Sequence, residues 1–370
     1  MVEGSMPHAE ILYLYSSNIR PLYEQDILDL LAAPRGTLYR FRYLGTKYLS
    51  PGLLEKDQAV LRQSLVSQRS VVHFALQQEA QYHQAAFIPV REGAVRRVES
   101  VGDIKVIEFE LGAYLALKKP APKQEGTRED PAGRQVRDYA DWLAKHNVPR
   151  PYDSWAGTGP DATIESTLMH DDKDEQVLFD QTAWYLSRTE SFRGARFLRV
   201  RRIYRLGSEH SIGEAIEAVD GTFTLEAGAT YGIEVIHSQP SDVHSREVFD
   251  VSADNALLRV VGKPTLEIAS RYDVLTLPVH AVDLPTNERR ETVLTIQPSI
   301  GIKGPRVELR LRVVRPAYRT ATAVGGSAAT ALLLGLPTLL PGLPIEIKVF
   351  CVFLAAALGA LLVNFGLRRT

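Results

Sequence analysis

Cysteine is almost missing from this sequence, since the single copy, Cys351, lies in an apolar run near the C-terminus. No disulfide can form within residues 1–350, and Cys351 can pair only with another copy of the chain, which fits a reducing compartment. A charge excess is missing too, because 43 lysines and arginines face 44 aspartates and glutamates. No global basic field therefore indicates a nucleic-acid-binding protein.

Signatures of catalysis are also missing. The sequence has no G-x-x-x-x-G-K-[ST] loop for nucleotide phosphates, no G-x-S-x-G nucleophile elbow and no H-E-x-x-H zinc motif. The acidic stretch MHDDKDE at 169–175 lacks the glycine and the ligand spacing of a calcium loop, so it favours a solvated loop over a metal site. We therefore expect no metal, no cofactor and no catalytic residue, although a membrane-bound enzyme with an unfamiliar site stays open.

Charged side chains are missing from two long stretches at the C-terminus, 320–345 and 349–367. A helix of about 20 residues crosses roughly 30 Å of hydrocarbon, so each stretch is long enough to span a bilayer. The proline-rich residues 337–344 suit the turn between the two helices. The sequence therefore predicts a transmembrane helical hairpin at 319–370. The alternative is a hairpin buried inside a large soluble protein.

Arginines around the hairpin predict its orientation. Basic residues precede the first run and follow the second, namely Arg310, Arg312, Arg315, Arg319, Arg368 and Arg369, whereas the loop between the runs holds only Lys348 beside Glu346. By the positive-inside rule, the large N-terminal part and the C-terminus both lie in the cytoplasm. The N-terminus lacks a basic region followed by an apolar core, so no signal peptide is predicted. We expect a protein of the bacterial inner membrane.

Small residues recur within the hairpin. Gly326 and Thr330, and likewise Ala355 and Gly359, have the small-xxx-small spacing that lets membrane helices approach closely. The contact lies either between the two helices of one hairpin or between copies in a homo-oligomer. Asn364 either hydrogen-bonds across helices or lies at the headgroup boundary.

The part before the hairpin has the patterns of a mainly β chain with some helix. Residues 1–117 predict a strand-rich α+β or barrel-like domain. Its elements are a helix starting at Pro21 and stopping before Pro34, and strands at Ile11–Tyr15, 37–43, Ser70–Leu76, Gln84–Pro89 and 103–117. Residues 118–175 predict a linker with a short amphipathic helix. Residues 176–318, with short strands from 176–180 onward and frequent turns, are typical of a β-sandwich.

Arginine is the strongest polar signal in these domains. On the strand predicted around "GARFLRVRRIYRL", Arg199 and Arg201 share one face with Ile203, and Arg202 shares the other with Val200 and Tyr204. On the strand 37–43, Arg40 and Arg42 share a face with Leu38. Guanidinium groups suit phosphates, so these five arginines are candidate ligands for a nucleotide or oligonucleotide. Solvated strand faces paired with carboxylates, or contacts with lipid phosphates, are the alternatives.

The hairpin at 320–367 behind a β-rich body resembles the membrane effectors of bacterial antiviral systems, including the Hailong effectors and the two-helix effectors of cyclic-nucleotide systems. The resemblance covers the architecture and no residue motif. It implies a nucleotide or oligonucleotide signal, or a partner protein that makes one, then oligomerisation through the hairpin into an ion-conducting assembly that permeabilises the membrane. A membrane-tethered scaffold, with the hairpin as a passive anchor, is the alternative.

Overall fold

The structure is a computed structural model. It describes residues 10–17, 20–45, 49, 69–76, 86–115, 145, 156–160, 172–207, 212–238, 247–284, 289–315, 344, 345, 347, 349, 350 and 352–355. The described chain is mainly β, as predicted, and its strands form three sheets.

The first sheet, here called the N-terminal sheet, has the strand order β2-β5-β4-β3-β1-β6. Its strands are β1 (Glu10–Ser17), β2 (Leu38–Leu44), β3 (Arg69–Leu76), β4 (Ala86–Val101), β5 (Ile104–Tyr114) and β6 (Ala156–Pro160). β1 and β3 are parallel, and the other neighbours are antiparallel. Alternation in β2 places Phe41 and Tyr43 in the core and leaves Arg40 and Arg42 exposed, which confirms the face predicted for these two arginines.

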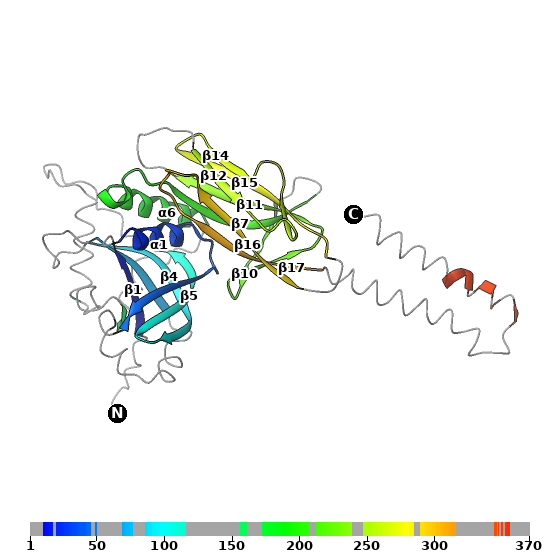
Figure 1. Ribbon diagram of the computed structural model, residues 1–370, viewed down its shortest axis with the longest axis horizontal. Coiled ribbons are helices and arrows are strands. Elements are labelled where there is room, and N and C mark those ends of the chain that lie inside the picture. Colours follow the sequence, from blue (N-terminus) through cyan, green and yellow to red (C-terminus); the bar gives the residue numbers. More distant parts are fainter. Residues whose placement is uncertain are drawn as a thin grey trace, which may run out of the picture.

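Two helices pack against the core of the N-terminal sheet (Figure 1). α1 (Pro21–Ala32) begins with a proline in its first turn, where no backbone N–H is needed, and the chain leaves the helix just before Pro34. Its buried residues Ile27, Leu28, Leu30 and Leu31 follow helical spacing. α1 lies between two layers, because it contacts β1 and β4 on one side and the strand β7 (Phe197–Leu206) on the other.

The predicted strand at 176–180 is wrong. These residues lie in α6 (Asp172–Ser187), which is followed by the short 3-10 helix η1 (Glu190–Phe192). Leu178, Phe179, Ala183 and Leu186 pack into the core of the N-terminal sheet. Their spacing is helical, and only the short run 177–179 looked like a strand because apolar runs of that length fit either structure.

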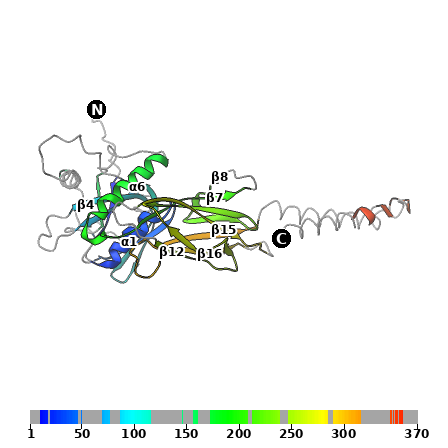
Figure 2. The same cartoon turned by 90° about the horizontal axis from the view of Figure 1, so that it is seen from above.

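The remaining strands form two sheets that share a second hydrophobic core (Figures 1 and 2). The β7 sheet has the order β13-β15-β11-β7-β8, and the β17 sheet has the order β14-β12-β16-β17-β10-β9. Besides β7, the bounds are β8 (Ile212–Ala215), β9 (Ala218–Val219), β10 (Thr222–Glu226), β11 (Thr230–Ser238), β12 (Glu247–Ser252), β13 (Leu258–Val260), β14 (Thr265–Ile268), β15 (Tyr272–Ala281), β16 (Arg290–Pro298) and β17 (Val307–Val314).

Beside α1, close contacts join the N-terminal sheet to the two sheets that share the second core. Ala32, the last residue of α1, belongs to the second core. A Cβ atom on Gly36 would lie 2.7 Å from the Cβ of Ala218, and one on Gly221 would lie 2.5 Å from Cγ of Leu38. The turn after α1 therefore fits against the β9–β10 hairpin only because both positions are glycine.

The predicted division of the chain into domains, with boundaries at 117, 175 and 318, stays a prediction.

The predicted hairpin lies mostly outside the described residues, and so do Gly326, Thr330, Gly359 and Asn364. Of the five predicted packing residues, only Ala355 is described, and it is buried. The amphipathic helix predicted within 118–175 also falls outside, apart from residue 145.

Among the described residues, no helix combines the length and the apolar character needed to cross a bilayer.

Candidate functional site

The predicted arginines on β2 face solvent on the N-terminal sheet. Arg40 forms an ion pair with Glu108 on the neighbouring strand β5. Arg42 is exposed on the same face. This arrangement fits the alternative in which a solvated strand face is balanced by carboxylates.

A β-bulge decides where the arginines of β7 point. Val200 pairs with Val235, and Arg202 pairs with Glu234, so Arg201 is an extra residue in β7. Arg201 and Arg202 consequently both reach Glu234, with N–O distances of 2.9 Å each. The predicted division of Arg201 and Arg202 between opposite faces is therefore wrong, because it assumed a strand of uniform period.

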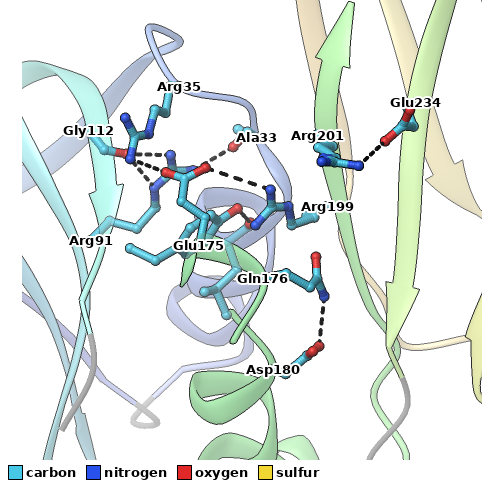
Figure 3. A network of polar contacts seen from close by, with 12 residues as sticks. Ala33, Arg35, Arg91, Gly112, Glu175, Gln176, Asp180, Arg199, Arg201 and Glu234 are labelled. Atoms are coloured by element: carbon cyan, nitrogen blue, oxygen red, sulfur yellow. Dashed lines mark hydrogen bonds and ion pairs between the residues drawn. The ribbon is translucent and has the colours of Figure 1, made fainter. Parts of the chain in front are cut away.

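Arg199 is separated from the other predicted arginines. It is 1% exposed, and its guanidinium lies over the rings of Tyr114 and Phe179 at 5.3 and 6.0 Å from their centroids. Arg199 therefore points toward β5 and α6, whereas Arg201 and Arg202 share Glu234 on β11 (Figure 3). Four of the five predicted ligand-binding arginines thus divide among separate ion pairs: Arg40 with Glu108, Arg199 with Glu175, and Arg201 and Arg202 with Glu234.

Around Arg199, the structure assembles a group that sequence reasoning missed, here called the arginine junction: Arg35, Arg91, Tyr114, Glu175 and Arg199. Arg91 is its structural centre. Its guanidinium donates hydrogen bonds to the carbonyl oxygens of Leu30 and Ala33 at the end of α1 and to that of Gly112 in β5. The hydroxyl of Tyr114 donates to the carbonyl of Leu31 at 2.6 Å.

The need for these donors follows from the sequence of α1. The last carbonyls of a helix have no partner within the helix, and the last turn of α1 contains no basic residue. Pro34 follows and cannot donate a backbone N–H. β4 and β5 therefore supply the donors, and the positive charge of Arg91 also complements the negative end of the helix dipole. Burial of Arg91 lowers the pKa of its guanidinium.

Tyr114 lies between two guanidinium groups, since its ring centroid is 4.3 Å from Cζ of Arg91 and 5.3 Å from Cζ of Arg199. Cations favour the face of an aromatic ring, and the attraction strengthens when water is excluded. The ring thus screens two buried cations that would otherwise repel each other. Tyr114 also packs edge-to-face on Phe179 of α6, at 5.6 Å between centroids.

Among the described residues, the carboxylate of Glu175 forms the ion pairs of the junction, with Arg35 and Arg199 (Figure 3). One oxygen is paired with Arg35, and Oε2 lies 3.7 Å from Nη2 of Arg199. Nε and Nη1 of Arg199 are buried and have no hydrogen-bond partner. A second carboxylate, Asp180, accepts a hydrogen bond from Gln176 at 2.9 Å, and burial raises its pKa although Arg199 acts to lower it. The junction is therefore rich in positive charge.

A second polar group, here called the acidic junction, connects α1 to the segment before β17. It consists of Glu24, Asp26, Asp29, Lys303 and Arg306. Asp29 accepts hydrogen bonds from the backbone N–H of Arg306 and from the side chain of Gln25, both at 2.6 Å. Nζ of Lys303 lies 2.7 Å from a carboxylate oxygen of Glu24. Burial raises the pKa of Asp29 to about 7, although these hydrogen bonds act to lower it.

Asp26 is the third carboxyl group of the acidic junction. It accepts a hydrogen bond from the hydroxyl of Tyr39 at 3.3 Å. Burial raises its pKa, while that hydrogen bond and the charge of Arg42 act in the opposite direction. The acidic junction can therefore take up protons near neutral pH.

Within the described part of the chain, no group of three or more His, Cys, Asp or Glu side chains is placed to hold a metal ion. What the arginine junction can do is bind an anion, because its guanidinium groups converge and one of them retains unused donors.

No protein-family model matches the chain, and no curated protein matches it. The solved structures with some similarity include a GH5 xyloglucanase from Bacteroides ovatus, 8% identical over 26% of this chain and 17% of that one, with a TM-score of 0.19. A FixG-related protein from Vibrio parahaemolyticus is 17% identical over 24% of this chain and 77% of that one, with a TM-score of 0.18. The CooA pilin subunit from enterotoxigenic Escherichia coli is 15% identical over 31% and 99%, with a TM-score of 0.17. TM-scores this low carry no argument about fold or function.

Proposed function

We propose that this chain is a membrane-anchored effector of antiviral defence. In this proposal the β-rich domains lie in the cytoplasm and sense a ligand or partner, and the C-terminal hairpins assemble in the inner membrane and permeabilise it. One chain supplies only two membrane helices, so several copies are needed to enclose a pore.

The observation that supports the proposal most is the exposure of apolar side chains among the described residues from 345 to 354, at the end of the first run and the start of the second. Ile345 is 73% exposed and Phe353 is 72% exposed. Other large apolar residues there are also exposed: Ile347, Val349, Phe350, Val352 and Leu354. A hairpin buried in a soluble body would cover such side chains, whereas a bilayer or neighbouring copies cover them without help from the body.

The position of β17 supports a mechanical link between the body and the tail. β17 lies inside its sheet, paired with β10 on one side and β16 on the other, and it ends at Val314. Only five residues separate Val314 from Thr320, where the uncharged run begins. A movement of the β17 sheet would therefore be transmitted to the first predicted membrane helix.

Topology is the first test of the proposal. A reporter fused after Thr370 should be active only in the cytoplasm, and the full chain should resist extraction from membranes by carbonate. Induction of the full chain together with the defence trigger should then collapse the membrane potential, measured with a voltage-sensitive dye. Recovery of the intact chain as a water-soluble particle, or an external reporter, would refute the proposal.

The second candidate is a membrane-tethered scaffold. It is favoured by the carboxylates that already occupy Arg40, Arg201 and Arg202, because arginines in such pairs are less available to a diffusible anion. Replacing residues 320–370 with an unrelated membrane hairpin separates the two. A scaffold keeps its activity after the exchange, whereas an effector that permeabilises the membrane loses it.

A further inference from the structure

We propose that the arginine junction is a binding site for a phosphate group, and that Glu175 occupies this site as an intramolecular substitute when no ligand is present. This inference rests on the ligand-sensing part of the proposed function and names the site for it. It does not require the tail to lie in a membrane.

The unused donors of Arg199 are the first argument. A guanidinium carries five N–H donors, and leaving buried donors without partners costs free energy. Arg199 is 1% exposed, its Nε and Nη1 have no hydrogen-bond partner, and its contact with Glu175 is as long as 3.7 Å. Glu175 thus satisfies Arg199 incompletely. An anion with more oxygens that approached Arg199 closely would use the remaining donors.

Charge balance is the second argument. Arg35, Arg91 and Arg199 bring three positive charges, and within the described part of the chain Glu175 is the carboxylate that pairs with two of them. The carbonyls at the end of α1 add roughly half a negative charge at Arg91. The nearby carboxylate of Asp180 accepts a hydrogen bond from Gln176. Arginine does not deprotonate in proteins, so the excess positive charge of the junction favours the binding of an anion. A doubly charged phosphate balances the junction better than one carboxylate does.

Access to the site is the third argument. The side chain of Arg35 is 47% exposed, so one wall of the junction faces solvent. Glu175 lies in the first turn of α6, while the residues that hold α6 on the core, including Phe179, Ala183 and Leu186, come later in the helix. Glu175 can therefore leave by a change in the first turn alone. The ligand would displace an acidic side chain, and α6 would stay in place.

The first experiment uses pyrophosphate as the probe, on the full chain purified in mild detergent. Glu175→Gln removes the proposed substitute and leaves the arginines. We expect a lower melting temperature for this variant without pyrophosphate, and a pyrophosphate affinity at least tenfold higher than that of the wild type, measured by calorimetry. The melting temperature should then rise with pyrophosphate concentration, since a ligand that binds the folded state stabilises it. Sodium chloride at matched ionic strength controls for screening.

Glu234→Gln is the matched control, because Glu234 also bridges two arginines, but these are Arg201 and Arg202, which lie outside the arginine junction. It should gain no pyrophosphate affinity. Adding Arg199→Gln to Glu175→Gln should abolish the gain. Equal responses of Glu175→Gln and Glu234→Gln, or no response of either, would overturn the inference.

Arg35→Gln keeps the test decisive if Glu175→Gln does not fold. Arg35 is half-exposed, so its replacement should spare the fold and weaken pyrophosphate binding to the otherwise wild-type chain at least threefold. Unchanged affinity would count against the site. Pyrophosphate binding by a chain that leaves the membrane potential intact would keep this inference and remove the proposed effector function, so the two failures are distinguishable.

Discussion

The two ends of α1 meet the rest of the molecule with opposite charges. Glu24 in the first turn, and further along the helix Asp26 and Asp29, belong to the acidic junction, and the last turn meets the arginine junction. Glu24 near the first turn and the guanidinium of Arg91 at the last turn complement the helix dipole, whose N-terminal end is positive and whose C-terminal end is negative. α1 is therefore held between two layers by charge at each end as well as by its apolar face.

The two junctions differ in how they can relieve buried charge. A buried carboxyl group can take up a proton, and the pKa of about 7 for Asp29 reflects that route. A buried arginine has no such route and needs an anion or hydrogen-bond acceptors. The comparison shows why the acidic junction should respond to pH, whereas the arginine junction should respond to anions. The following predictions test this difference, beginning with the largest effect.

The largest expected effect comes from Arg91→Met. The change keeps apolar volume but leaves the carbonyls of Leu30, Ala33 and Gly112 without their buried donor. We expect the free energy of unfolding to fall by about 3–5 kcal/mol, measured by chemical denaturation. Arg96→Met on the same strand, which breaks a partly exposed pair with Glu110, should cost less than about 1 kcal/mol. Similar losses for both variants would mean that Arg91 does not cap α1.

Asp29→Asn should remove a pH dependence that belongs to the acidic junction. The pKa of Asp29 rises from its ordinary value of 3.8 to about 7, so the folded state holds a proton that the unfolded state has lost. Between these values the stability contributed by this group falls as pH rises. We expect wild-type stability relative to Asp29→Asn to decline by about 2 kcal/mol from pH 5 to pH 8.

Wild type has to be compared with Asp29→Asn because another group, His73, changes the stability of the protein with pH in the opposite direction. Burial lowers the pKa of His73 to about 3, which lowers stability as pH falls below the ordinary value of 6.5. This contribution is common to wild type and variant and cancels in their difference. Asp103→Asn, at an exposed turn residue, should keep the wild-type profile. A difference between wild type and Asp29→Asn that does not change with pH would contradict the prediction.

The smallest expected effect comes from comparing Gly36→Ala with Gly194→Ala. The comparison separates the cost of a close contact from the cost of backbone strain. Gly36 and Gly194 both have positive φ, at 80° and 74°, but only Gly36 has a neighbour in the way of a Cβ atom. Replacing either with alanine adds the strain of a left-handed residue. Gly36→Ala should cost about 1 kcal/mol more than Gly194→Ala in thermal unfolding, because it also pushes Ala218 away. Equal costs would mean that this contact is loose.

Much of the N-terminal sheet and α1 could be predicted from local patterns. Alternation gave the two faces of β2 correctly, and the spacing of Ile27, Leu30 and Leu31 with Pro34 beyond predicted α1 correctly. The same method failed at 176–180, where three apolar residues fitted a strand and a helix equally well. It also failed at Arg201, because a single extra residue in β7 reverses every face that follows it.

The arginine junction was predicted in part only, through Arg199. One signal for the rest was available, since a helix ending at Pro34 without a basic residue in its last turn requires donors from elsewhere. Nothing in the sequence says that the donor is Arg91, some 58 residues away from Ala33. Glu175 was read as part of a solvated acidic loop, and the structure instead buries it against arginines.

The sequence by itself determined the strand-rich body, the start and end of α1, and the two uncharged runs near the C-terminus, because those features depend on side-chain period and composition within one segment. Only the tertiary structure decided which arginines are buried together, which carboxylate pairs with them and which acids of α1 meet in the acidic junction. These groupings depend on strand register, on a bulge and on contacts between residues far apart in the chain, and no local pattern encodes the distance between two such side chains.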